Sequence, residues 1–107
     1  MLPKSRRLSH KDFLTAKSHG KTYRTPHFSA VVYLTSPQPS RFAIVTSSKL
    51  HKHAVVRNRL RRRIYEILRA KHYALSADLI IFPHQSMLNL SHEELVLALD
   101  SFLSKIS

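Results

Sequence analysis

The 107-residue sequence contains no cysteine and no tryptophan, and it has a single glycine. Without cysteine, the chain can form neither disulfides nor thiolate metal sites. No apolar run approaches the roughly 20 residues that a membrane-spanning helix needs. The first residues lead into charged ones and not into a secretory apolar segment. We therefore expect one cytoplasmic domain over residues 1–107, with no membrane partner.

Acidic residues are scarce as well. None of the six is placed so that two carboxylates would meet, and no glycine-rich loop could hold a phosphate. Eight histidines are scattered along the chain, and only His51 and His53 are close in sequence, without an acidic third ligand. The sequence therefore predicts neither catalytic side chains nor a metal site in this chain.

Basic residues are abundant and unevenly distributed. Residues 1–72 carry 17 Lys and Arg against 2 acids, whereas residues 73–107 carry 1 against 4. Between Lys49 and His72 the only acid is Glu66. A solvated helix face usually interleaves both signs of charge, and adjacent arginines repel unless an anion lies against them. The pattern favours a surface that binds nucleic acid, although most charge runs are solvated helix faces.

The centre of this basic stretch has helical periodicity over residues 54–70. Apolar residues recur at Val56, Leu60, Ile64 and Ile67. At about 100° per residue, the opposite half of the helix carries Asn58, Arg61, Arg62, Tyr65 and Arg69. Arg59 and Arg63 fall nearer the apolar stripe, and we expect their methylene groups to lie along the edge of the core.

The other elements follow from apolar patterns and turn residues. We expect a helix over 10–18, a loop over 21–27, strands over 28–34, 41–46 and 78–82, and a helix over 92–105. Two prolines between the first two strands predict a hairpin with a slack turn. Continuous apolarity predicts that the third strand is covered on both faces.

Two capping boxes support the outer helices, one from Ser9 to Asp12 and one from Ser91 to Glu94. Gly20 is expected to end the first helix in a left-handed conformation. The aromatic residues are assigned mainly to the core, although some on the first helix and the hairpin are expected in a groove. They are Phe13, Phe28, Tyr33 and Phe42, whereas Phe82 and Phe102 are assigned to the core alone.

The string AVVRNRLRRRIYE resembles the signature of the bacterial ribonuclease P protein component. The matching residues are Ala54, Val55, Arg57, Asn58, Arg59, Arg61, Arg62 and Glu66. The resemblance extends through Arg7 and Leu8, Phe13, Gly20, Phe28 and Lys49, and so spans nearly the whole chain. It implies the protein subunit of an endoribonuclease that removes the 5′ leader of precursor tRNA. The catalytic groups and Mg²⁺ are then expected on the RNA subunit and substrate, not in a dedicated protein site.

The resemblance also implies partners and site residues. The partners are ribonuclease P RNA and precursor tRNA, and no protein partner is required. Residues expected to bind the RNA are Lys49, Lys52, Arg57, Asn58, Arg59, Arg61 and Arg62. Residues expected to line a cleft for the leader are Arg7, Phe13, Lys17 and Phe28. The chain departs from the family pattern at Leu50, where a basic residue is usual, and at Tyr65, where an arginine is usual.

The expected fold class is α+β, in the order αββαβα around a small central sheet. A helix between two strands of one sheet normally makes a right-handed crossover. The resemblance implies the rare left-handed βαβ connection of a ribosomal-protein-S5-like fold. The alternative function is a ribosomal-type basic RNA-binding protein with no enzyme association. A helix-turn-helix DNA-binding protein is disfavoured, because strands and a loop, not a partner helix, precede the basic helix.

Overall fold

The computed structural model describes residues 8–34, 41–70 and 77–106. In chain order the elements are α1 (His10–His19), β1 (Lys21–Arg24), β2 (Phe28–Leu34), β3 (Arg41–Ile44), α2 (Ala54–Ala70), β4 (Ala77–Pro83), the 3₁₀ helix η2 (Gln85–Asn89) and α3 (His92–Ile106). The predicted α+β class, three helices and three strands are confirmed. Two elements, β1 and η2, were not predicted.

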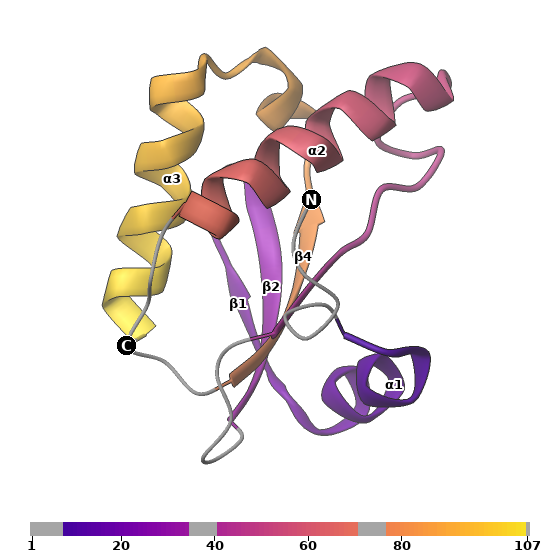
Figure 1. Ribbon diagram of the computed structural model, residues 1–107, viewed down its shortest axis with the longest axis vertical. Coiled ribbons are helices and arrows are strands. Elements are labelled where there is room, and N and C mark those ends of the chain that lie inside the picture. The colour runs from indigo at the N-terminus through magenta and orange to yellow at the C-terminus, as the bar shows by residue number, and fades with distance from the viewer. Residues whose placement is uncertain (1–7, 35–40, 71–76, 107) are drawn as a thin grey trace.

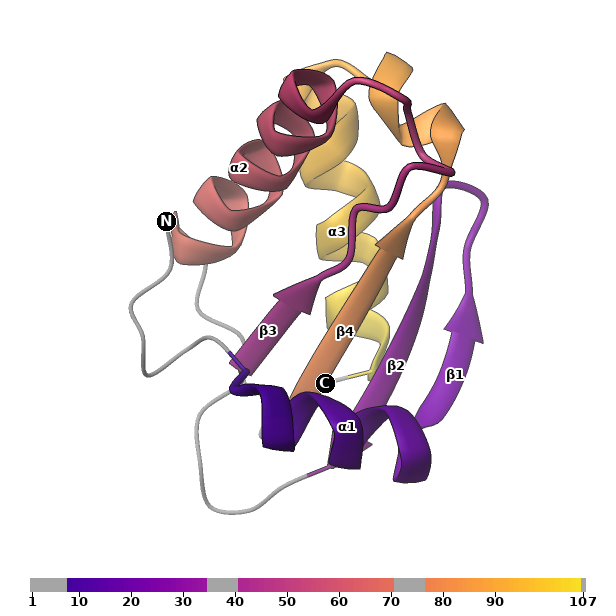
Figure 2. The same cartoon turned by 90° about the vertical axis from the view of Figure 1, so that its right-hand side faces the viewer.

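The four strands form one sheet in the order β1-β2-β4-β3 (Figures 1 and 2). β2 pairs antiparallel with β1 and with β4, whereas β3 pairs parallel with β4. The predicted hairpin between residues 28–34 and 41–46 is therefore wrong, and its turn at 36–40 lies outside the described residues. β2 and β4 take the two interior positions, and Leu79, Ile80 and Ile81 are fully buried, so the prediction that this strand is covered on both faces is confirmed.

β1 lies where the sequence predicted a loop. Its four residues pair with 29–32 of β2 as a hairpin. Thr25 closes the turn, because its hydroxyl donates to the Phe28 carbonyl at 2.8 Å and accepts from the Phe28 N–H at 3.1 Å. As an edge strand β1 keeps mostly exposed polar side chains, so its hydrophobic alternation is too weak to see in the sequence.

Helices cover both faces of the sheet, and the two faces hold separate apolar clusters. α2 and α3 pack on one face, where the larger core includes Phe28, Phe42, Leu79 and Ile81. α1 packs on the other face through a small cluster of Ala16, Val31 and Ile80 (Figure 2). We call this second surface the α1 face.

The β3–α2–β4 crossover is left-handed. In Figure 2, β3 and β4 run upwards, β4 lies to the right of β3, and α1 lies in front of the sheet. α2 packs on the face behind, in the cluster opposite to that of α1. A connection that passes behind the sheet and returns one strand to the right turns in the left-handed sense, contrary to the usual preference. The connection implied by the family resemblance is confirmed.

Both outer helices begin at the predicted capping serines. At α3 the box is reciprocal: the Ser91 N–H donates to the Glu94 carboxylate at 2.9 Å, and the Glu94 N–H donates to the Ser91 hydroxyl at 3.2 Å. The first of these bonds lowers the pKa of Glu94. At α1 the Ser9 hydroxyl accepts from the Asp12 N–H and donates to the Asp12 carboxylate. That carboxylate also accepts from Arg41.

Gly20 follows α1, but its role differs from the predicted one. Its backbone is extended, with φ −76° and ψ 161°, so the predicted left-handed termination is wrong. A Cβ atom at this position would lie 2.6 Å from the Ala16 carbonyl oxygen and 2.6 Å from Cγ1 of Val31. Glycine is needed because the end of α1 packs directly against β2, and no space remains for a side chain.

We expect Gly20→Ala to lower the free energy of unfolding by about 1–3 kcal/mol, because the added methyl group overpacks a contact with backbone. Urea denaturation followed by circular dichroism measures the change. Ser18→Ala, at an exposed position two residues earlier, is the matched control and should shift the midpoint little. Equal midpoints for the two variants would contradict the packing role of Gly20.

Candidate nucleic-acid interface

The buried stripe of α2 is wider than the sequence indicated. It comprises Leu60, Ile64, Tyr65, Ile67 and Leu68. Tyr65 was predicted on the outward half, and this is wrong, because only 7% of the residue is exposed. α2 packs against both the sheet and α3, so the core covers a wider sector of the helix than one packing partner would. Burial of Tyr65 rotates the centre of the buried face towards the half of the helix that was predicted to be exposed.

This rotation changes which arginines face solvent. Arg59 and Arg62 are both exposed. The prediction that Arg59 lies along the edge of the core is therefore wrong. Arg63 is partly buried, as predicted, and its Nη2 donates to the Leu90 carbonyl at 3.4 Å. Arg59 and Arg62 are thus the arginines in the first half of α2 that are most open to an anion.

The other α2 residues predicted to bind RNA, which are Arg57, Asn58 and Arg61, are half-buried and held in place. Nη2 of Arg61 donates to Oδ1 of Asn58 at 2.8 Å. Nη1 of Arg57 donates to the carbonyl oxygens of His51 and Lys52 at 2.8 and 3.2 Å. Arg57 thereby fixes the loop before α2, and each arginine keeps further N–H groups for an anion.

The loop over 45–53 places two more cations beside α2. Leu50 is 5% exposed and anchors the loop in the core, which gives a packing reason for an apolar residue where the family usually has a basic one. The side-chain amide of Gln85 donates to the Lys49 carbonyl at 3.0 Å. The side chains of Lys49 and Lys52 remain exposed beside a hollow of about 440 Å³. The basic patch is defined here as Lys49, Lys52, Arg57, Asn58, Arg59, Arg61 and Arg62.

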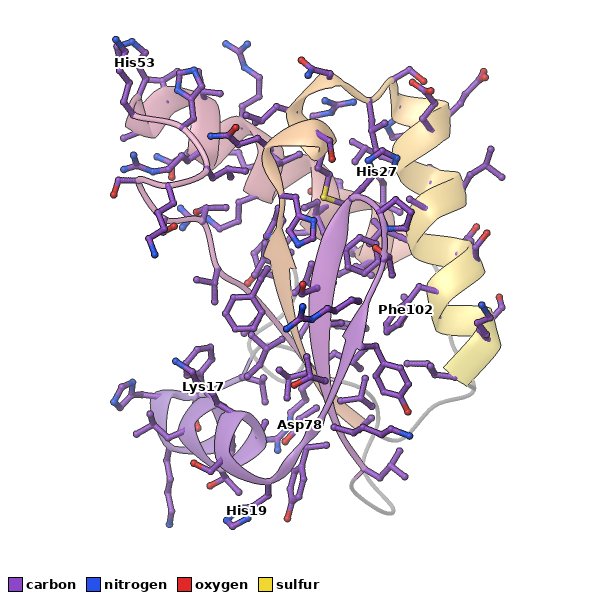
Figure 3. The ribbon with its side chains drawn as sticks, turned by 180° about the vertical axis from the view of Figure 1, so that it is seen from behind. Lys17, His19, His27, His53, Asp78 and Phe102 are labelled. Atoms are coloured by element: carbon purple, nitrogen blue, oxygen red, sulfur yellow. The ribbon has the colours of Figure 1, made fainter. Side chains whose placement is uncertain are left out.

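The residues predicted to line a leader cleft do not all meet. Phe13 is half-buried against the α1 face, and Lys17, one turn later on α1, is exposed (Figure 3). Phe28 is fully buried on the opposite face, 5.4 Å from Phe102 between ring centroids, so its assignment to the cleft is wrong. Arg7 lies outside the described residues.

Phe82 is an aromatic residue of the α1 face that the sequence assigned to the core alone. It is partly buried, and it packs with Ala43 and Val45 in the same cluster as Phe13. The strand alternation contained the signal, because Asp78, Ile80 and Phe82 share one face of β4. The α1 face therefore offers half-buried aromatic rings from both the helix and the sheet, namely Phe13 from α1 and Tyr33 and Phe82 from the strands.

Arg41 joins α1 to the sheet at this face. Its Nε and Nη2 donate to the two carboxylate oxygens of Asp78 at 2.9 and 2.8 Å, and Nη1 donates to Asp12 of α1 at 2.8 Å. Asp78 of β4 is 2% exposed, and Figure 3 shows it beside α1. The bond to Asp78 raises the pKa of Arg41. The three residues thus fix the position of α1 on the sheet.

The described surface combines exposed cationic groups with half-buried aromatic rings. Over residues 8–34, 41–70 and 77–106, no three histidine or acidic side chains lie close enough to hold a metal ion. No helix in these ranges is long and apolar enough to cross a membrane. Exposed guanidinium and ammonium groups beside half-buried rings are suited to phosphates and unpaired bases. The fold and this surface define a small α+β protein with a strongly basic face.

Comparisons with known proteins identify the family to which this chain belongs. The profile of the family described as Ribonuclease P matches residues 2–107. A ribonuclease P protein component from Finegoldia magna is 32% identical over 101 residues, which cover 92% of this chain and 88% of that protein. One from Microcystis aeruginosa is 42% identical over 73 residues, covering 64% of this chain and 61% of that protein. The chain belongs to the ribonuclease P protein family.

Solved structures support the fold. The RNase P protein from Thermotoga maritima has a TM-score of 0.83 at 24% identity, covering 94% of this chain and 97% of that one. The Staphylococcus aureus RNase P protein has a TM-score of 0.79 at 24% identity, covering 96% and 95%. The aligned part of the chain spans 61% of the length of the Microcystis relative and 55% of one from Picosynechococcus.

We expect Arg41→Ala to lower the free energy of unfolding by about 3 kcal/mol, because it leaves the buried Asp78 carboxylate without its partner. Chemical denaturation measures the loss. Arg69→Ala removes an arginine from an exposed ion pair with Glu66 and should leave stability almost unchanged. If the two variants lose equal stability, Arg41 does not hold α1 on the sheet as described.

Proposed function

We propose that this chain is the protein subunit of ribonuclease P, an endoribonuclease that removes the 5′ leader of precursor tRNA. The observation that carries the proposal is the basic patch. It brings six Lys and Arg together over α2 and the preceding loop, with no acid among its members. Such a surface is stabilised by a polyanion, and membership of the family makes ribonuclease P RNA the expected one.

The cations of the basic patch fall into two groups, which would contribute differently to RNA binding. Arg59, Arg62, Lys49 and Lys52 project freely and would neutralise phosphates of the RNA. Arg57 and Arg61 are preorganised by their bonds to the loop and to Asn58, so little side-chain entropy is lost when they bind. The free cations would supply salt-dependent affinity, and the fixed ones would set the orientation of the protein on the RNA.

The α1 face is the proposed site of the single-stranded leader. Phe13 and Phe82 offer ring surfaces on which unpaired bases can stack, and Lys17 lies beside them on α1 with its ammonium group in solvent. Stacking accepts any base, so this surface would hold leaders of varied sequence. Arg41 sets the height of α1 above the sheet and therefore the space for a base.

Catalysis is assigned to the RNA subunit. The Mg²⁺ ions, bound by the RNA and the substrate, would activate the attacking water and stabilise the leaving group. This chain would bring the two RNAs together in the cytoplasm and reduce the repulsion between their phosphates. The shortage of acidic residues, with Asp12 and Asp78 both paired to Arg41, supports this assignment.

The test of the function is cleavage of precursor tRNA at low Mg²⁺. We expect no cleavage by the protein alone. Adding the protein to ribonuclease P RNA should give cleavage at a Mg²⁺ concentration where the RNA alone is inactive, because cationic side chains replace part of the ionic screening. Cleavage by RNA-free protein would refute the assignment of catalysis to the RNA. Binding to ribosomal RNA with no effect on cleavage would instead indicate a ribosomal-type protein.

A second test concerns the two exposed arginines of α2. We expect Arg59→Ala with Arg62→Ala to weaken binding to ribonuclease P RNA about tenfold. The slope of log affinity against log salt should become shallower by about 1.5, since two phosphate contacts are lost. The control is Lys11→Ala with Arg69→Ala, which removes the same charge at exposed positions outside the basic patch. Equal losses in the two double variants, with unchanged melting temperatures, would mean that net charge and not the patch determines affinity.

A further inference from the structure

A groove of about 920 Å³ lies between β1 and α3, and the functions proposed above leave it unused. Tyr23 of β1 and Phe102 and Ile106 of α3 form part of its apolar lining. Figure 3 shows Phe102 projecting from α3 towards the strands. The sheet order places β1 at the edge opposite to β3, which leads into the loop of the basic patch. The groove is therefore separate from the proposed docking surface for ribonuclease P RNA.

The rim of this groove is basic. Lys21, Arg24 and Lys105 are lining residues with exposed side chains, and no acidic residue is among the described residues that line the groove. Lys105 is the only Lys or Arg in residues 73–107, a segment that also contains four acids. The rim therefore complements an anion even where the chain is otherwise acidic.

The apolar wall is aromatic and held by its own packing. The Tyr23 ring meets Phe102 edge-to-face with centroids 5.8 Å apart, and Phe102 meets the buried Phe28 in the same way at 5.4 Å. Nζ of Lys21 lies 5.3 Å from the centroid of Tyr23. Tyr23 is only partly buried. A fixed ring with a cation beside it matches a nucleobase with its phosphate.

The groove adjoins the α1 face. Its lining includes His19, the last residue of α1, and Tyr33, which packs with the cluster beneath α1. The centroids of these two rings are 6.3 Å apart. A strand of RNA that crosses the α1 face towards β1 would reach the groove by turning over this edge of the sheet.

We propose that the β1–α3 groove binds single-stranded RNA, namely leader nucleotides that extend beyond those held on the α1 face. The proposal rests on the proposed function, because it extends the path of the same substrate. A peptide or a second copy of the chain could instead add to β1 as a fifth strand. Lys21 and Arg24 disfavour this, because cationic residues on an edge strand oppose strand addition.

The test compares binding of two precursor tRNAs to the complex of the protein with ribonuclease P RNA. One carries a leader of roughly 4 nucleotides and the other a leader of roughly 12, and both lengths fall within the range of known single-stranded sites, roughly 4–16 nucleotides. Lys21→Glu and Lys105→Glu should each weaken binding of the long-leader substrate about fivefold and leave the short-leader substrate unaffected. Lys11→Glu reverses one exposed charge on the outer side of α1 and is the matched control.

The proposal is overturned if both groove variants behave like Lys11→Glu, or if they weaken both substrates equally. It is also overturned if they change the sedimentation of the protein and not leader affinity, since that would indicate a second copy in the groove. Circular dichroism must first show that each variant is folded. Leu34→Ala, at a lining position with 73% exposure, offers a further variant that keeps the charge and should weaken only the long-leader complex.

A measurement on the free protein separates this proposal from the proposed function. Aromatic NMR spectra are recorded with a single-stranded RNA 12-mer, a length of about one such site. The ring signals of Tyr23 and Phe102 should shift on titration, and Lys105→Glu should raise the concentration required about fivefold. Shifts here without protein-dependent cleavage would retain the groove and reject ribonuclease P. Cleavage without such shifts would support the ribonuclease P function and reject the groove as an RNA-binding site.

Discussion

The ion pair between Arg41 and Asp78 is the constraint on which the rest of the structure depends. Asp78 is the one charged residue that is buried in the described part of the chain, and it lies on the central strand. A buried carboxylate is tolerated only when its oxygens are satisfied, and Arg41 of the neighbouring strand satisfies both. The register between β3 and β4 is thereby fixed at Arg41 opposite Asp78, and the remaining guanidinium nitrogen orients α1.

The fold separates the surfaces that the chain offers to its partners. α2 packs on one face of the sheet and extends its first turns, with the preceding loop, beyond the sheet (Figure 1). α1 packs on the other face and leaves half-buried rings beside it. The basic patch and the half-buried rings of the α1 face therefore belong to different sides of the sheet. The left-handed crossover is part of this arrangement, because it determines which face receives α2.

Several features were predictable from residue patterns because they depend on local interactions. The bounds of α2 follow from helical periodicity, those of α3 from a capping box, and the central position of β4 from its continuous apolarity. The choice of strand partners was not predictable, since the hairpin expected from chain order is replaced by a pairing across a longer separation in sequence. Among the candidate site residues, the identity of the basic residues was clear, whereas their exposure was not.

The sequence by itself determined the positive charge of this protein, its scarcity of acidic residues and the position of its basic stretch, because all three follow from composition and spacing. Tertiary structure alone decided which side chains are exposed to solvent and which are buried. Tyr65 and Phe28 are buried, Arg59 and Phe82 are at least partly exposed, and Gly20 is required by a close contact and not by its backbone angles. The physical reason is that burial depends on which elements pack together. A helix covered by both a sheet and another helix buries a wider sector than its own apolar stripe predicts.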